Sequence, residues 1–172
     1  MDPRLLTLLS RLQSSRFTEL AGSEARATIR IAAPLLNEAA ATFAASTPAV
    51  RDVSIRPRAS NHIDVALKLA RPAFLPSLNI TLQIERQPQL PEDPELVLRL
   101  RGAGGMMRLA GPAISSFGAL PPGVRLDGDY VFVDLRTVLR QHGQGELLDY
   151  VEQLQVMSEE GSVIVLIQLR IR

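Results

Sequence analysis

The feature that most limits what this chain can fold into is a period-two alternation of apolar and polar side chains. Apolar residues occupy the odd positions of residues 63–69 and the even positions of residues 78–84. The same alternation recurs over residues 53–56 and 96–100. Successive side chains of a β-strand point to opposite faces, so such strands have one apolar and one polar face. The sequence therefore predicts a long antiparallel sheet with one face covered and the other in water.

A single helix is suited to cover that face. Pro34 opens a predicted helix over residues 35–45, which is apolar almost all round. A helix with so little polar surface is normally enclosed by protein. We therefore expect an α+β fold in which a long, strongly curved antiparallel sheet wraps around one apolar helix.

Shorter elements complete the expected body. Residues 25–31 alternate with period two and predict a half-buried strand. Ser60-Asn61 predicts a turn, Asp127-Gly128 predicts a hairpin turn of type I′, and Asp134 is placed to cap a short helix over residues 135–141. Three further elements are expected after it: a helix over residues 146–153 and strands over residues 154–157 and 163–171.

The N-terminal segment predicts an amphipathic helix over residues 1–20, and residues 21–172 form the sheet-and-helix body of one domain spanning 1–172. Four leucines give this helix its apolar side: Leu5, Leu8, Leu9 and Leu12. They are suited to dock onto an open end of the sheet. The alternative is peripheral contact with a membrane, apolar side down and arginines at the headgroups.

The composition restricts the function. Of the residues 46% are apolar but only 4% aromatic, and 19 basic side chains nearly balance 18 acidic ones. With few stacking rings and no strong field, nucleic-acid binding is not expected. There is no cysteine, no apolar stretch near the ~20 residues of a membrane span, and no pattern typical of a secretion signal. We expect a soluble cytoplasmic protein, with peripheral membrane contact as the alternative.

No motif in the sequence predicts catalysis, a metal or a cofactor. The glycine-rich segment 102–107 has Met107 where a dinucleotide loop needs glycine. Asp127, Asp129 and His142 are the best candidates for a catalytic group, but Asp127-Gly128-Asp129 is explained more simply as a hairpin turn. We therefore expect a non-enzymatic protein.

Three arginine pairs two residues apart project from predicted strands. On a strand, such residues share a face, so each pair is suited to bind a phosphate. The alternative is that they are solvated exterior positions that discourage edge-to-edge association. The pairs are Arg56/Arg58, Arg99/Arg101 and Arg170/Arg172.

The predicted interior is the remaining candidate site. The helix over residues 35–45 has alanine at many inward positions, which either brings it close to the sheet or leaves room for a ligand. An aliphatic groove with few polar groups suits an acyl chain. The expected ligand-binding residues are Leu36, Ala40, Phe43, Val65, Leu67, Ile80, Leu82, Val165 and Ile167. The alternative is a scaffold or interaction module with a filled core, acting through a sheet edge or the N-terminal helix, with a homodimer left open.

The order of these elements resembles the bacterial tubular lipid-binding (TULIP-like) proteins, including LmeA-like and YceB-like members. The resemblance rests on a strand that enters Pro34-Leu35-Leu36-Asn37, on the alternating strands that follow, and on three later segments: Leu120-Pro121-Pro122-Gly123-Val124, Asp127-Gly128-Asp129 and Val133-Asp134-Leu135. It implies a highly curved sheet that wraps one long helix and encloses a tube for lipid tails. It thus implies a protein that binds a lipid or another hydrophobic molecule.

Overall fold

The fold combines nine strands with three short helical elements in the part of the chain that the computed structural model describes, residues 22–70, 77–101 and 120–170. The strands are β1 (Glu24–Ala32), β2 (Val50–Arg58), β3 (His62–Leu69), β4 (Leu78–Arg86), β5 (Glu95–Arg101), β6 (Val124–Asp127), β7 (Tyr130–Asp134), β8 (Val151–Glu159) and β9 (Ser162–Arg170). The helices are α2 (Ala33–Ser46), α4 (Leu135–Gln141) and the 3₁₀ helix η2 (Gly145–Tyr150). The α+β class expected from the sequence is confirmed.

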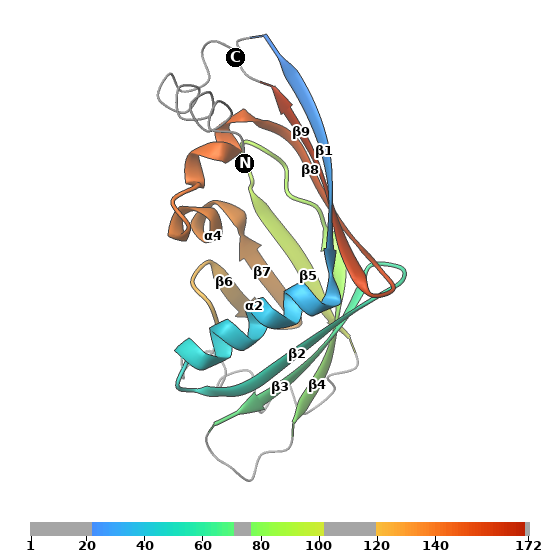
Figure 1. Ribbon diagram of the computed structural model, residues 1–172, viewed down its shortest axis with the longest axis vertical. Coiled ribbons are helices and arrows are strands. Elements are labelled where there is room, and N and C mark those ends of the chain that lie inside the picture. Colours follow the sequence, from blue (N-terminus) through green and yellow to red (C-terminus); the bar gives the residue numbers. More distant parts are fainter. Residues whose placement is uncertain (1–21, 71–76, 102–119, 171–172) are drawn as a thin grey trace, which may run out of the picture.

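The strands form two antiparallel sheets rather than the one long sheet predicted. The first has the order β1-β9-β8, and the second has the order β2-β3-β4-β5-β7-β6. The six-stranded sheet is strongly curled into a half-barrel, and the three-stranded sheet continues it along the long axis of the molecule (Figure 1). The division arises because β9 pairs with β1 on one side and with β8 on the other, while the strands from β2 to β7 pair among themselves.

The register of the six-stranded sheet follows the alternation in the sequence. Val65 lies opposite Ile80, and Ile63 lies opposite Leu82. Leu82 in turn lies opposite Leu100. Because paired residues share a face, the apolar side chains at these alternating positions project to one side, and the predicted alternation of the sheet is confirmed.

Helix α2 begins with proline in its first turn and packs along β2, an edge strand. The Asn37 side chain makes the hydrogen bonds that a neighbouring strand would otherwise make with that edge. Its Nδ2 donates to the Ile55 oxygen at 2.8 Å and to the Ala33 oxygen at 2.7 Å, and its Oδ1 accepts from the Ile55 nitrogen at 2.8 Å. Only Ala40 of this helix is fully buried, and Leu35 is 57% exposed. The expectation that a sheet wraps around the helix is therefore not confirmed.

Three more side chains, those of Asn61, Gln87 and Ser158, join the sheets at what we call the sheet junction (Asn61, Gln87, Val156 and Ser158). The Gln87 amide donates to the Val156 oxygen and accepts from the Val156 nitrogen, both at 2.8 Å. The Ser158 nitrogen donates to Asn61 Oδ1 at 3.0 Å, and the buried Ser158 hydroxyl donates to the His62 oxygen at 2.9 Å. These side chains thus bond the backbone N–H and C=O groups at the edge of β8, which a neighbouring strand would otherwise bond.

The turns and caps confirm some predictions and correct others. Ser60 and Asn61 both have positive φ, as the predicted turn requires. Asp134 caps α4 as expected, its Oδ1 accepting from the Arg136 and Thr137 nitrogens at 2.9 and 3.2 Å. In the β6–β7 turn only Gly128 has positive φ, which fits type II′ and not the predicted type I′.

The C-terminal elements also differ from the prediction. The helix expected over residues 146–153 is the 3₁₀ helix η2, and β8 begins at Val151, two residues before the expected end of that helix. The reason is the pairing of Val151 with Leu169, which extends the β8–β9 ladder beyond the predicted strand over residues 154–157. The half-buried strand predicted over residues 25–31 corresponds to β1, but β1 is exposed at every position except Ile31. It is an edge strand with one paired neighbour, β9.

Candidate functional site

The candidate site is the apolar side of the two sheets, which we call the inner face. In the six-stranded sheet it carries Val65, Leu67, Ile80 and Leu82, which lie side by side on β3 and β4. Phe43 of α2 packs against the same side, which defines it as the face toward the helix. The paired positions on this side, from β2 to β6, hold no charged residue. The face therefore attracts apolar groups and offers nothing to polar ones.

The three-stranded sheet continues this face through one contact. Ile29, Val165 and Val156 form a row across β1, β9 and β8. Val156 also packs against the cluster formed by Ile84, Leu96 and Leu98 of the six-stranded sheet. Ile167 lies in the next row, between Ala27 and Leu154. The apolar surface thus runs from the curled sheet onto the second sheet.

Much of this surface is not covered by the described residues. Of the nine residues predicted to bind a ligand, Ala40 alone is fully buried, at 7% exposure, and the others are half-buried. Ile29, in the same row as Val165, is 46% exposed. In a globular chain of this length, large aliphatic side chains of the core are normally buried completely. The inner face therefore leaves apolar area available for contact.

The structure brings the nine predicted residues together only in part. Leu67, Ile80, Leu82 and Phe43 belong to one packed cluster. Val165 and Ile167 lie on the other sheet and are linked to this cluster through β8. Val65 and Ile80 also line a polar cleft with Arg56, Asp64 and neighbouring residues. An enclosed apolar tunnel between helix and sheet stays a prediction.

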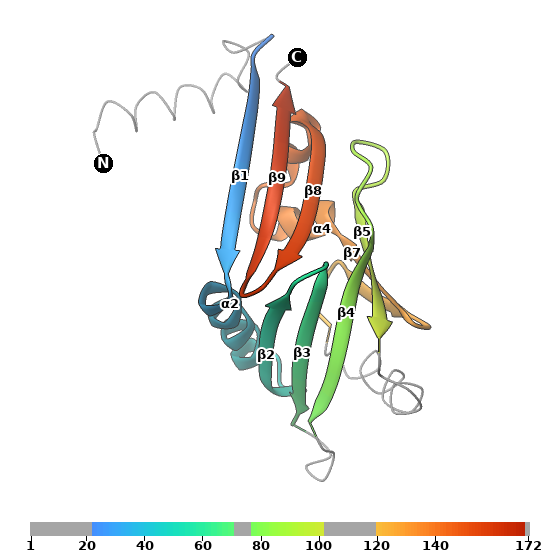
Figure 2. The same cartoon turned by 90° about the vertical axis from the view of Figure 1, so that its right-hand side faces the viewer.

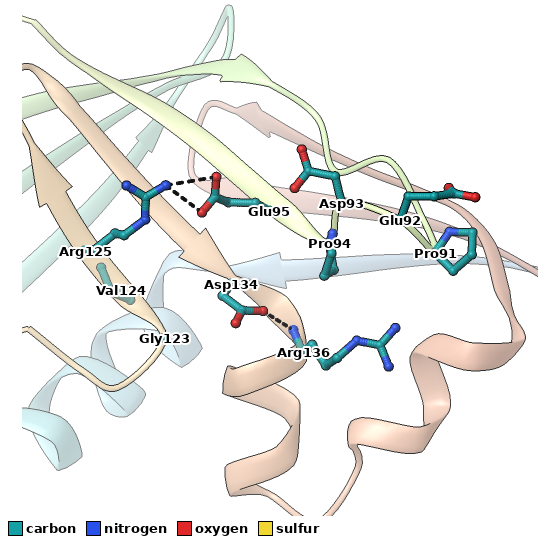
Figure 3. A pocket seen from close by; sticks show the side chains of 10 residues that line it. All are labelled: Pro91, Glu92, Asp93, Pro94, Glu95, Gly123, Val124, Arg125, Asp134 and Arg136. Atoms are coloured by element: carbon teal, nitrogen blue, oxygen red, sulfur yellow. Dashed lines mark hydrogen bonds and ion pairs between the residues drawn. The ribbon is translucent and has the colours of Figure 1, made fainter.

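A second, polar cleft of about 540 Å³ opens between the loop before β5 and the start of α4 (Figure 3). Its charged side chains largely neutralise one another. Arg125 Nη2 lies 3.0 Å from Glu95 Oε2, and Arg86 Nη2 lies 3.2 Å from Asp93 Oδ2 and 3.3 Å from Glu95 Oε1. The Arg125 guanidinium also stacks over the Phe132 ring, 3.7 Å from its centre. These contacts fix the loop to the end of β4 and the start of β5 to β6.

Asp134 is the carboxylate of this cleft with a shifted pKa. Burial raises its pKa, but hydrogen bonds from the Thr137 hydroxyl and from the Thr137 and Arg136 amides outweigh that effect, so the pKa is lowered overall. A carboxylate held ionised by a helix cap is not suited to donate a proton. The arrangement explains Asp134 as a structural residue.

Four of the five described arginines of these pairs are engaged with neighbouring carboxylates and amides. Arg58 contacts Asp64 at 2.9 Å and Glu160 at 3.3 Å, and the hydrogen bonds from Thr81 and Arg58 lower the pKa of Asp64. Arg99 lies 4.0 Å from Glu85, and Arg101 donates to Gln83. Arg170 contacts both Glu24 and Glu152. These contacts favour solvated exterior positions over phosphate binding; Arg172 lies outside the described residues.

The residues nominated for catalysis are not gathered. Asp127 and Asp129 lie at the turn between β6 and β7, whereas His142 follows α4, which starts from the other end of β7. The described residues contain no cluster of three or more side chains suited to hold a metal ion. Among them there is also no helix long and apolar enough to cross a membrane. The predicted N-terminal helix, with Leu5, Leu8, Leu9 and Leu12, lies outside the described residues.

The amides of Asn37, Asn61 and Gln87 are the structural residues that the sequence patterns did not reveal. Each occupies an unremarkable position in a turn, helix or loop, and no periodicity distinguishes it. Comparison with known proteins adds no relative: no family model, curated protein or solved structure matches this chain. The resemblance to TULIP-like proteins stays a prediction, and the case for function rests on the inner face.

Proposed function

We propose that this chain binds a lipid or another hydrophobic molecule against its inner face, without catalysing a reaction. One observation supports this proposal above the rest. Val65, Leu67 and Leu82 face the concave side of the half-barrel, yet they remain half-buried. A face that is apolar, uncharged and incompletely covered favours a partner that is itself apolar.

The physical basis of such binding is the removal of acyl methylenes from water, worth about 0.8 kcal/mol each. The chain would lie along β3 and β4 between α2 and the sheet, against Leu36, Ala40 and Phe43. The polar headgroup would stay in solvent, because the inner face offers it no charged partner. The same ligand would reach Val165 and Ile167 on the second sheet. A cytoplasmic location, with or without peripheral membrane contact, fits this proposal.

Native mass spectrometry of the purified protein, followed by organic extraction, tests the proposal directly. We expect a bound hydrophobic molecule, and we expect a fluorescent fatty acid to bind and compete with it. Protein that is free of ligand and fails to bind the fluorescent probe would overturn the proposal.

Matched variants distinguish the inner face from other surfaces. Val65→Thr and Ile80→Thr keep β-branched side chains but place hydroxyls on the inner face, so both should weaken probe binding. Ala66→Thr makes a similar change on the opposite face of β3, beside Asn79, and should leave the affinity unchanged. Equal effects of the three variants would show that the probe binds elsewhere.

A second candidate function is an interaction or scaffold module that uses a sheet edge. It is favoured by the exposure of β1, whose two faces are both open to solvent. This candidate needs no ligand. It predicts that delipidated protein has the same stability as the purified protein, whereas the first candidate predicts a loss of stability on delipidation.

A further inference from the structure

The sheets have four edges, and three of them are protected against pairing with another strand. The edge of β8 is bonded by the amides of Asn61 and Gln87, and the edge of β2 is bonded by Asn37. The third edge, β6, is only four residues long. Short strands and bonded edges are the usual means by which proteins avoid edge-to-edge association.

The fourth edge, β1, has none of these protections within the described residues. It is nine residues long and ends the order of its sheet, and no described strand pairs with its outer edge (Figure 2). Its ladder with β9 runs from Glu24 to Ala32 without a register shift, whereas the β8–β9 and β4–β5 ladders contain shifts. A long, regular and open edge is a template for another strand.

We propose that β1 pairs with β1 of a second copy, antiparallel and across a twofold axis, so that two three-stranded sheets become one continuous sheet of six strands. Because the twofold axis is perpendicular to the sheet, each even-numbered residue of β1 lies opposite an even-numbered residue of the second copy, and each odd-numbered residue lies opposite an odd-numbered one. Only a small number of registers meet this condition, and they differ in which charged side chains lie opposite each other.

The register centred on Ala27 is the one that the charges favour. It places Glu24 opposite Arg30 of the second copy, twice, and Arg26 opposite Thr28. Centring the pair on Thr28 would place Arg26 opposite Arg30, and centring it on Arg26 would place two arginines face to face. Opposite charges across strands stabilise a pairing and like charges destabilise it.

Existing ion pairs extend this pattern. Glu24 is already held by Arg170, and Arg30 Nη1 lies 3.1 Å from Glu159 Oε2. In the Ala27 register these groups form a row of alternating charges across the interface. Exposed ion pairs contribute little free energy, so the row selects the register rather than supplying the affinity. On the other face, Ile29 lies opposite Ala25 of the second copy, which covers the side chain that is 46% exposed in one copy.

Cysteine cross-linking tests the register, because the natural chain has no cysteine. Ala27→Cys lies on the axis, where opposed Cα atoms are about 4.5–5.5 Å apart and within reach of a disulfide. Ala25→Cys changes the same residue type on the same face, but its two copies are four residues out of register, about 13 Å apart. We expect rapid disulfide dimers from Ala27→Cys and none from Ala25→Cys. Equal cross-linking of both variants would overturn the register.

Sedimentation of the complete chain tests the pairing itself. We expect a dimer, and we expect Ala27→Lys to be monomeric because it places two ammonium groups together on the axis. Ala41→Lys, on the exposed side of α2, is the control and should remain dimeric. A monomeric native chain, or a dimeric Ala27→Lys variant, would overturn the proposal. A monomer that still binds the fluorescent fatty acid would overturn the pairing alone and leave the proposed function intact.

Discussion

Asn37 offers the sharpest test of how this fold closes its edges. We consider Asn37→Leu, which keeps the branched shape and the number of heavy atoms of the side chain and removes its amide. Three hydrogen bonds are lost, two to Ile55 and one to Ala33. At about 1 kcal/mol each, the free energy of unfolding should fall by about 3 kcal/mol. For a domain of 172 residues, this lowers the melting temperature by about 6–12 °C.

The measurement is thermal and urea unfolding followed by circular dichroism. Asn79→Leu is the matched control, because Asn79 is exposed on the outer side of β4 and the same substitution there should change stability by less than about 0.5 kcal/mol. An Asn37→Leu variant as stable as the native chain, or a control that is equally destabilised, would refute the view that this amide replaces a strand neighbour.

Three other predictions concern single residues. Gln87→Glu keeps the acceptor for the Val156 nitrogen, but a carboxylate cannot donate to the Val156 oxygen. The folded state should therefore favour the protonated acid and raise its pKa, so the variant should approach native stability below about pH 4.3 and lose about 1–3 kcal/mol as the pH rises through the raised pKa, as urea titrations across pH would show. Asp134→Ala removes the cap of α4 and should cost about 1–2 kcal/mol at neutral pH. Because the folded pKa of Asp134 is lowered, this difference is present above about pH 3.9 and should shrink as the pH falls through that lower pKa; a constant difference would contradict the assignment. Gly123→Ala combines a φ of +84° with a Cβ only 3.1 Å from Thr137 Cβ, whereas Gly128→Ala at φ +56° meets open space. Calorimetry should therefore show a larger loss of stability for Gly123→Ala than for Gly128→Ala.

Local patterns in the sequence predicted local structure well. The alternation over residues 63–69 and 78–84 located β3 and β4, because strand periodicity depends only on which face is covered. Asp134 was identified as a helix cap because a carboxylate just before an apolar stretch has few other uses at that position. Pro34 marked the start of α2 for a similar reason.

The division into two sheets could not be predicted in this way. It depends on contacts between residues far apart in sequence, such as Gln87 with Val156, and a lone amide has no periodic signal. The exposure of β1 was missed for a related reason. Its alternation predicts one covered face, but whether a covering element exists is decided by the placement of other strands. Of the candidate site, the inner-facing residues of β3 and β4 were predictable, and their incomplete burial was not.

The three amides that close the strand edges also set a chemical lifetime for the fold. Asparagine and glutamine are among the residues that heat and storage degrade, through slow hydrolysis to the acid. Hydrolysis at Gln87 would add a negative charge beside the Val156 carbonyl oxygen of the other sheet, while the strand ladders stay intact. Where this hydrolysis occurs, the two sheets should therefore loosen from each other before either ladder separates.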